Sequence, residues 1–182
     1  MRHLKMKLLR FLLNKPFLRI DSAIGKISAR MARSCDRFIL RQCYEDGMKT
    51  YIDKVWGWDP AWQDKEFHQS LKTSATYVLE NREARLIGYF QLKHADRQSD
   101  YLRMLILKPE VQSMGIGTQI LSEIRQKAQN HGRTLRLRVF KVNSRAKRFY
   151  ERNGWNIIAD DDPYFLMENP QNTLSINPKQ PQ

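Results

Sequence analysis

Hydrophobic positions in the central part of the chain repeat with two spacings, one typical of strands and the other of helices. Short apolar or alternating runs predict strands at residues 26–32, 75–80, 85–93, 100–107, 135–140, 155–159 and 164–168. Apolar residues three and four positions apart predict helices over residues 34–55, 60–71, 116–131 and 144–153. This order of elements predicts an α/β (α+β) chain with about six to seven strands.

Capping residues are found where three of the predicted helices begin. Ser34 precedes the first helix, and Asp59 precedes the second, which has Pro60 in its first turn. A short polar side chain at such a place accepts a free backbone N–H, and proline fits the first turn because its missing N–H would have no partner there. Asn143 or Ser144 is expected to cap the last, short helix.

A turn with two glycines, at residues 109–118, connects the strand at 100–107 to the helix that follows it. Gly115 and Gly117 let the backbone approach a ligand, and the free N–H groups of a helix N-terminus attract anions. A plain turn without a ligand is the alternative. The turn lacks the Gly-Lys-Ser/Thr of nucleotide hydrolases and the third glycine of a dinucleotide fold. The ligand class that remains is another compound with a pyrophosphate.

Basic residues outnumber acidic residues, and the excess is uneven. The formal net charge is +13 at pH 7, of which residues 1–26, with seven basic residues and one acidic residue, supply +6. Such a charge favours polyanionic partners, namely phosphate ligands, nucleic acid or an anionic membrane surface. Because basic and acidic residues are interleaved beyond residue 26, nucleic acid is not expected as a partner.

The composition divides the chain into three regions. Residues 1–25 form a basic extension, which either lies as an amphipathic helix in weak contact with a membrane surface or is a leader outside the domain. The chain is 41% hydrophobic, which suffices for one core, and we place that domain at residues 26–168. Residues 169–182 are rich in Asn, Gln, Pro and Ser, and we expect a disordered tail.

The two cysteines and the lack of a long apolar run indicate a cytoplasmic protein. Cys35 and Cys43 lie about 12 Å apart along one predicted helix, which is too far for a disulfide. We therefore expect free thiols in a reducing compartment. No apolar run approaches the roughly 20 residues of a membrane span. No metal site is expected.

Two motifs about thirty residues apart resemble those of one protein family. They are Gln112-x-x-Gly115-x-Gly117 and Asn143-x-x-Ala146-x-x-Phe149-Tyr150-Glu151-Arg152-x-Gly154-Trp155. With the order of predicted elements, they resemble the GNAT superfamily of acetyl-CoA-dependent N-acetyltransferases over roughly residues 27–168. The resemblance implies a mixed central sheet flanked by helices, acetyl-CoA as co-substrate, and transfer of an acetyl group to a primary amine of a small molecule or peptide. The stretch Trp56-Gly57-Trp58-Asp59-x-Ala61-Trp62-Gln63 also resembles a signature of one GNAT subgroup.

The resemblance implies a coenzyme site that includes the glycine turn. Main-chain groups of the strand before the turn would pair with the pantetheine arm, and N–H groups of the turn would bind the pyrophosphate. The implied residues are Leu105, Ile106, Leu107, Gln112, Ser113, Met114, Gly115, Ile116, Gly117, Thr118 and Asn143. Gln112 is expected to order the turn rather than to take part in the chemistry. Asn143 either contacts the coenzyme or only caps its helix.

The resemblance also implies that Tyr150 is the general acid. A phenol keeps its proton at neutral pH and can give it to the leaving thiolate. The alternative is that Tyr150 packs beside Phe149 as an ordinary aromatic residue. The general base is left unassigned, because Asp100, His94 and Glu80 are candidates that also fit ordinary surface groups, and a chain of waters is a further alternative.

Four residues are expected to bind the acceptor amine. Trp56, Trp58 and Trp62 either wall a substrate pocket or pack in the core. Arg138 stands where some members of the family carry a glutamate, and if it faces the cleft it favours an acceptor with a carboxylate or phosphate. The protein is expected to be a monomer or a homodimer. The competing hypotheses are a GNAT domain that binds coenzyme A without turnover and a basic protein that binds nucleic acid or a membrane surface.

Overall fold

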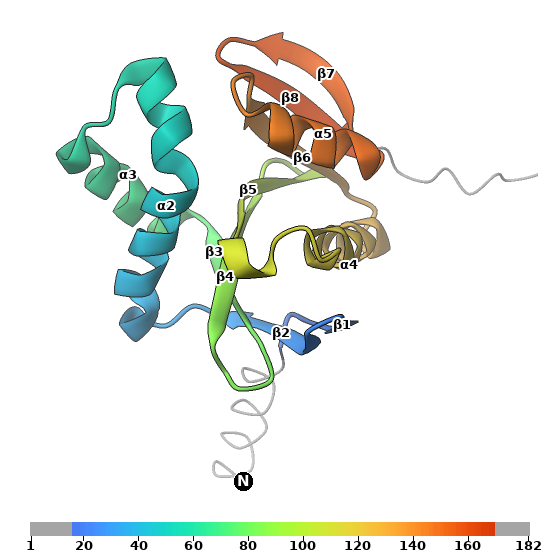
Figure 1. Ribbon diagram of the computed structural model, residues 1–182. Coiled ribbons are helices and arrows are strands. Elements are labelled where there is room, and N and C mark those ends of the chain that lie inside the picture. The colour runs from blue at the N-terminus through green and yellow to red at the C-terminus, as the bar shows by residue number, and fades with distance from the viewer. Residues whose placement is uncertain (1–15, 170–182) are drawn as a thin grey trace, which may run out of the picture.

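Hydrogen bonds join eight strands into one sheet with the order β1-β2-β3-β4-β5-β6-β8-β7 in the computed structural model, which describes residues 16–169 (Figure 1). The strands are β1 (Leu18–Ser22), β2 (Gly25–Met31), β3 (Ala75–Glu80), β4 (Leu86–His94), β5 (Ser99–Leu107), β6 (Thr134–Phe140), β7 (Asn156–Asp161) and β8 (Tyr164–Asn169). The helices are α2 (Arg37–Trp56), α3 (Pro60–Thr73), α4 (Ile116–Asn130) and α5 (Ser144–Arg152), with 3₁₀ turns η1 (Ser34–Asp36) and η2 (Pro109–Val111). β5 and β6 are parallel and the other pairs are antiparallel, which confirms the expected mixed sheet.

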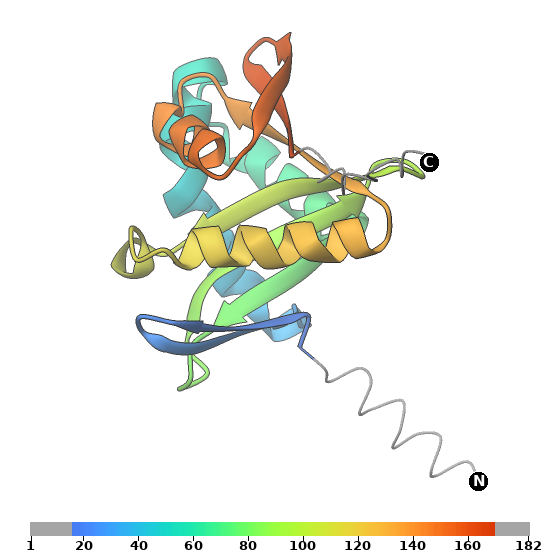
Figure 2. The ribbon, with the colours of Figure 1, turned by 90° about the vertical axis from the view of Figure 1, so that its right-hand side faces the viewer.

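Helices cover both faces of the sheet, and alternation along the strands divides the apolar residues between two cores. Val78 and Tyr89 pack with α2 and α3, whereas their neighbours Leu79 and Phe90 pack with α4. Successive side chains of a strand point to opposite faces, so one strand serves both cores. Figure 2 shows α4 lying across one face of the sheet, with α2 and α3 on the other. The central strands β3 and β4 are therefore buried on both sides.

The ladder between β5 and β6 is short. It joins only three residue pairs, from Ser99 with Thr134 to Tyr101 with Arg136. Beyond this point the two strands diverge, so the rest of β5 has no ladder partner on its β6 side. Arg133 stabilises the end at which the two strands pair, because its Nε donates to Asp100 at 2.7 Å and its Nη2 donates to the Ser99 carbonyl at 2.9 Å. The splay, by which we mean this separation of β5 from β6, leaves main-chain groups of β5 without a strand partner, as the expected pairing with a pantetheine arm needs.

The N-terminal boundary differs from our expectation. β1 lies inside the range 1–25 that we assigned to an extension, and it pairs with β2 from Leu18 opposite Ala29 to Ser22 opposite Gly25. The alternation of apolar Leu18 and Ile20 with two charged residues is a strand signal that the composition of the segment obscured. The sheet consequently has eight strands. The rest of the predicted extension and nearly all of the predicted tail lie outside the described residues.

Two of the three predicted helix caps are confirmed. The carboxylate of Asp59 accepts the N–H of Trp62 at 3.0 Å, and the amide oxygen of Asn143 accepts the N–H of Ala146 at 3.0 Å. Ser34 does not cap α2, because it begins the 3₁₀ turn that precedes that helix. Among residues 16–169, no helix is both long and apolar enough to cross a membrane.

Candidate active site

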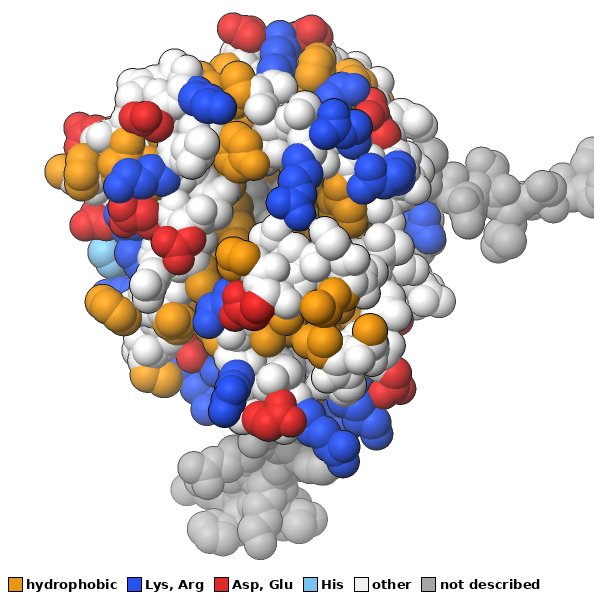
Figure 3. Space-filling view, in the orientation of Figure 1, with side chains coloured by type: hydrophobic (Ala, Val, Ile, Leu, Met, Phe, Trp, Pro, Cys, Tyr) orange, Lys and Arg blue, Asp and Glu red, His pale blue; other side chains and the backbone are white. Residues whose placement is uncertain are grey.

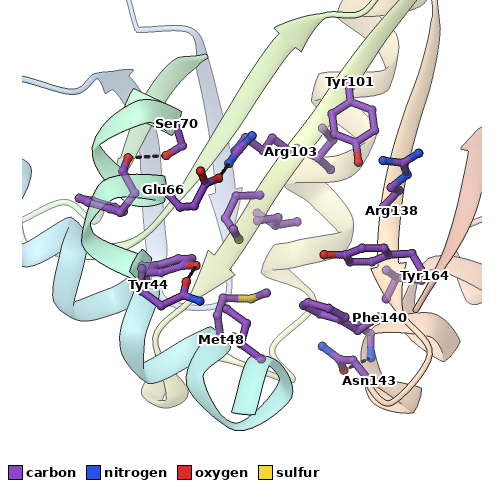
Figure 4. Close-up of a pocket in the computed structure, with 18 of the residues that line it drawn as sticks. Tyr44, Met48, Glu66, Ser70, Tyr101, Arg103, Arg138, Phe140, Asn143 and Tyr164 are labelled. Atoms are coloured by element: carbon purple, nitrogen blue, oxygen red, sulfur yellow. Dashed lines mark hydrogen bonds and ion pairs between the residues drawn. The ribbon is translucent and has the colours of Figure 1, made fainter. Parts of the chain in front are cut away.

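A cavity of about 330 Å³ opens where β5 and β6 diverge (Figure 4). One wall comes from α2 and α3, the opposite wall from β6, α5 and β8, and residues 101–105 of β5 lie between them. Most of its lining is aromatic or aliphatic, with a few charged and polar side chains. This composition is typical of a small-molecule site.

The glycine turn has a backbone suited to an anion. Ser113 and Gly115 both have positive φ, of 62° and 75°, and α4 begins directly after them at Ile116. Left-handed residues beside a helix N-terminus turn free N–H groups toward one point, where the positive end of the helix dipole also lies. Gln112 donates from Nε2 to the carbonyl of Leu107 at 2.7 Å. That bond fits the role expected for Gln112, since it ties the turn to the end of β5.

Gly117 serves the packing of two helices. A Cβ at this position would lie 3.0 Å from Cζ of Phe149, which belongs to α5. The absence of a side chain therefore lets the start of α4 approach α5 closely. The glycine turn and the second motif are in contact through this pair.

Basic side chains beside the turn escaped the sequence analysis. Arg145 of α5 donates from Nη2 to Oγ of Ser113 at 3.4 Å. Figure 3 shows Lys and Arg side chains gathered over α5, which has the sequence SRAKRFYER. These charges favour an anion at the turn. Basic residues in the first turn of the second motif would have been the signal for Arg145.

Tyr150 and Asn143 both line the cavity. The ring of Tyr150 contacts Phe149 and Trp155, with centroids 5.3 and 5.6 Å away. Its hydroxyl makes no hydrogen bond within the described part of the chain. Burial raises the pKa of Tyr150, and the phenol of Tyr101 adds to the shift. The residue thus packs against aromatic neighbours and also lines the cavity, and its phenol keeps its proton at neutral pH.

The tryptophans expected to bind the acceptor separate into two groups. Trp56 and Trp62 line the cavity, whereas Trp58 is not among its lining residues. Trp58 instead packs against Tyr44 with a centroid distance of 6.1 Å, and the cations of Arg41 and Lys49 lie 5.7 and 5.5 Å from its ring. Its place fits the packing alternative rather than an acceptor site.

The acidic candidates from the sequence lie elsewhere. Asp100 contacts His94 and Arg133 where β5 and β6 pair, and Glu80 pairs with Arg30 at 2.8 Å. Neither carboxylate lines the cavity. These groups form structural ion pairs, so their candidacy as general base is not supported by their positions.

Glu66 of α3 is the one carboxylate among the described residues that line the cavity. It lies 4.0 Å from Arg103 of β5 and is 40% exposed. The sequence analysis missed it, because a glutamate on a polar helix face has no local signal. Within residues 16–169, no group of three or more His, Cys, Asp or Glu side chains could hold a metal ion.

Solved structures of acetyltransferases share this fold. The PaiA N-acetyltransferase of Thermoplasma acidophilum, in complex with coenzyme A, is 21% identical; the match covers 79% of this chain and 98% of that chain with a TM-score of 0.64. A GNAT family acetyltransferase of Elizabethkingia anophelis with acetyl-CoA bound is 15% identical, with coverage of 78% and 96% and a TM-score of 0.58. No curated protein matches the chain significantly.

The family model described as the acetyltransferase (GNAT) family matches residues 39–155. The matched range includes both motifs, the glycine turn and α5 with Tyr150. The subgroup suggested by the tryptophan-rich stretch stays a prediction. The chain belongs to the GNAT family of acetyltransferases.

Proposed function

We propose that this protein transfers the acetyl group of acetyl-CoA to a primary amine of a small molecule or peptide, by direct attack in a ternary complex with Tyr150 as general acid. The observation that carries the proposal is the cavity at the splay, which brings the free edge of β5 and the hydroxyl-bearing side chain of Tyr150 into one space. Family membership supports acetyl transfer in general.

The described residues fit acetyl-CoA, which supplies the acetyl group as a thioester. Main-chain groups of residues 105–107 are offered to the pantetheine arm along the open edge of β5. The turn from Ser113 to Thr118 offers N–H groups to the pyrophosphate, with Arg145 beside it. Asn143 lines the cavity while its amide oxygen caps α5, so its amide nitrogen is the part that can face the coenzyme.

Two proton transfers accompany the reaction. Tyr150 gives its proton to the sulfur as the carbon–sulfur bond breaks and the carbon–nitrogen bond forms. We assign the acceptance of a proton from the amine to Glu66, the carboxylate of the cavity wall. Exchange with solvent then returns both side chains to their starting states.

Isothermal titration with acetyl-CoA and a thiol-release assay over a panel of amines test the proposal. We expect Tyr150→Phe to bind acetyl-CoA as the unaltered protein does while kcat falls by about 10²-fold or more. Tyr51→Phe, which removes a hydroxyl outside the cavity, is the matched control and should leave kcat unchanged.

Three results would count against the proposal in different ways. Failure of the folded protein to bind acetyl-CoA would contradict the whole assignment. Binding without turnover of any amine would favour the non-catalytic coenzyme A-binding alternative. An unchanged kcat in Tyr150→Phe would contradict only the role of the phenol.

A further inference from the structure

Among residues 16–169, the charged residues that line the cavity are Glu66, Arg103 and Arg138, which leaves one positive charge in excess. Glu66 and Arg103 are only loosely paired, with 4.0 Å between the carboxylate oxygen and Nη2. An excess of guanidinium groups in a cavity with apolar walls favours a ligand that brings its own negative charge.

Arg103 reaches the cavity because of an irregularity in β5. The pairing with β4 passes from Met104 opposite Gln91 to Leu102 opposite Leu92, so Arg103 is the extra residue of a β-bulge. A bulge bends its strand and changes the direction of a side chain. Here it occurs beside the point where β5 and β6 separate, and Arg103 lines the cavity.

Arg138 approaches from the opposite wall. Its Nη2 is 2.6 Å from Oδ2 of Asp161, which orients the guanidinium, and 49% of the side chain is exposed. A guanidinium has five N–H donors, so this one partner leaves donors for a ligand. A group that is already oriented loses less conformational entropy when the ligand binds.

The phenol of Tyr101 lies between the two arginines (Figure 4). Burial raises the pKa of Tyr101, and the nearby charges of Arg138 and Arg103 act in the opposite direction. Both arginines line the cavity together with this phenol. Tyr101, Arg103 and Arg138, which we call the arginine pair site, all line this cavity, and their N–H and O–H groups can donate hydrogen bonds to an anionic ligand.

Apolar surface adjoins this site on the wall of β6 and β8. Phe140 and Tyr164 stack with centroids 4.5 Å apart, and Trp56 meets them edge-on at 5.4 and 5.9 Å. All three rings line the cavity. They offer a surface for an aliphatic or aromatic body that connects an anionic group to an amine.

We propose that the acceptor is a primary amine that also carries a carboxylate or phosphate, and that the arginine pair site binds this anionic group. The amino acids and the phosphate esters of amino alcohols are the two sources of this chemistry. The inference rests on the proposed acetyl transfer and narrows its acceptor from primary amines in general to anionic ones.

Matched pairs of acceptors test the inference, because each pair differs only in the anionic group. The first pair is phenylalanine and phenethylamine, and the second is phosphoethanolamine and ethanolamine. In whichever pair fits the cavity better, we expect kcat/KM for the anionic member to be at least about tenfold higher than kcat/KM for the member without the anionic group. The pair that shows this preference identifies carboxylate or phosphate as the group recognised.

Variants identify the residues responsible. Arg138→Gln and Arg103→Gln should each remove most of the preference by raising KM for the anionic member, without changing the Kd of acetyl-CoA. Arg136→Gln is the matched control, since Arg136 lies on the same strand, pairs with Glu168 at 2.6 Å and does not line the cavity. It should keep the preference. Circular dichroism verifies that each variant is folded.

Several outcomes would overturn the inference while leaving the proposed function intact. These are a preference for the uncharged or cationic members, an unchanged preference in both arginine variants, or acetylation of polyamines alone. If no member of either pair is acetylated, phenylalanine and phosphoethanolamine are titrated into the complex of the protein with coenzyme A. Absence of binding by both compounds overturns the inference. Failure of the proposed function itself is seen separately, as loss of acetyl-CoA binding.

Discussion

Tyrosine is the most frequent polar side chain of the cavity, and burial shifts each of its four phenols in the same direction. Tyr44, Tyr101, Tyr150 and Tyr164 all line the cavity, and burial raises the pKa of each, that of Tyr164 to about 12. An apolar environment disfavours the phenolate, so all four hydroxyls remain donors at neutral pH. The cavity is therefore lined with proton-bearing groups.

The raised pKa of Tyr150 has a consequence for the pH dependence of kcat. A general acid acts while it holds its proton, and a pKa above the ordinary value of about 10 keeps the proton to higher pH. We expect kcat to stay level or rise from about pH 7 to about pH 9.5. Stopped-flow measurement of thiol release at saturating acceptor checks this. A fall in kcat centred below about pH 9 would contradict Tyr150 as the acid.

Glu66 provides the second test at this scale. If it accepts the proton of the amine, Glu66→Gln should lower kcat by about 10²-fold, because the amide cannot take a proton. The Kd of acetyl-CoA, measured by titration, should not change. Glu45→Gln on α2, whose carboxylate pairs with Lys49 and does not line the cavity, is the control. Equal activity of Glu66→Gln and the unaltered protein would remove Glu66 from the mechanism.

At the scale of elements, the sequence predicted those features that depend on neighbouring residues. The strand over Ala75–Glu80, the cap at Asp59 and the cap at Asn143 all depend on local spacing and local hydrogen bonds. β1 was missed because its short alternating pattern adjoins a basic, leucine-rich segment whose composition resembles that of a leader.

The cavity wall could not be predicted in the same way. Glu66 and Arg103 meet only because α3 packs over β5, and a bulge against β4 sets the position of Arg103. Neither the packing of α3 over β5 nor the bulge can be predicted from the residues that neighbour Glu66 and Arg103 in the sequence. Arg138, in contrast, was identified because it stands where some members of the family carry a glutamate, and the residue does line the cavity.

The contact between α4 and α5 gives a prediction for Gly117→Ala. Alanine in a helix usually stabilises by about 0.5–1 kcal/mol relative to glycine. Here the new Cβ would lie 3.0 Å from Phe149, and overpacking of this kind costs about 1–3 kcal/mol. We expect a net loss of stability on thermal unfolding and weaker acetyl-CoA binding.

A smaller partner should relieve the strain. Phe149→Leu added to Gly117→Ala is expected to recover part of the acetyl-CoA affinity, since the ring atom nearest to the new Cβ is gone. Ser122→Ala, an exposed change on α4, should leave binding as it was. Equal binding by Gly117→Ala and the unaltered protein would show that Phe149 yields without cost.

At the scale of the whole molecule, one ion cluster links the N-terminal strands to the start of α2. Arg30 of β2 contacts Asp36 at 2.7 Å and Glu80 of β3 at 2.8 Å, and Asp36 also accepts the N–H of Arg33 at 2.6 Å. The hydrogen bond from Arg30 lowers the pKa of Asp36, although burial opposes it. The sheet and the helix layer are thus tied together by a charged carboxylate.

Asp36→Asn should therefore destabilise the fold in a pH-dependent manner. We expect a loss of about 2 kcal/mol near neutral pH, measured by urea unfolding. Because the folded-state pKa is lowered, this contribution is present above the unfolded-state value of about 3.9 and is lost as pH falls through the folded-state value. The two unfolding free energies should begin to approach each other below about pH 4 and meet only at pH values below the folded-state pKa. A difference that is independent of pH would contradict the role of the carboxylate charge.

The three-pair ladder between β5 and β6 divides the sheet into two parts, β1 to β5 and β6 to β8, which few hydrogen bonds join. An extended molecule that lies in the gap and forms hydrogen bonds with the open edge of β5 acts as a substitute strand. Bound coenzyme would therefore complete the hydrogen bonding of the sheet. The concentration of the coenzyme in the cell would then influence the stability of the association between the two parts of the sheet. A cell short of it would carry a looser and more easily digested form of the same chain.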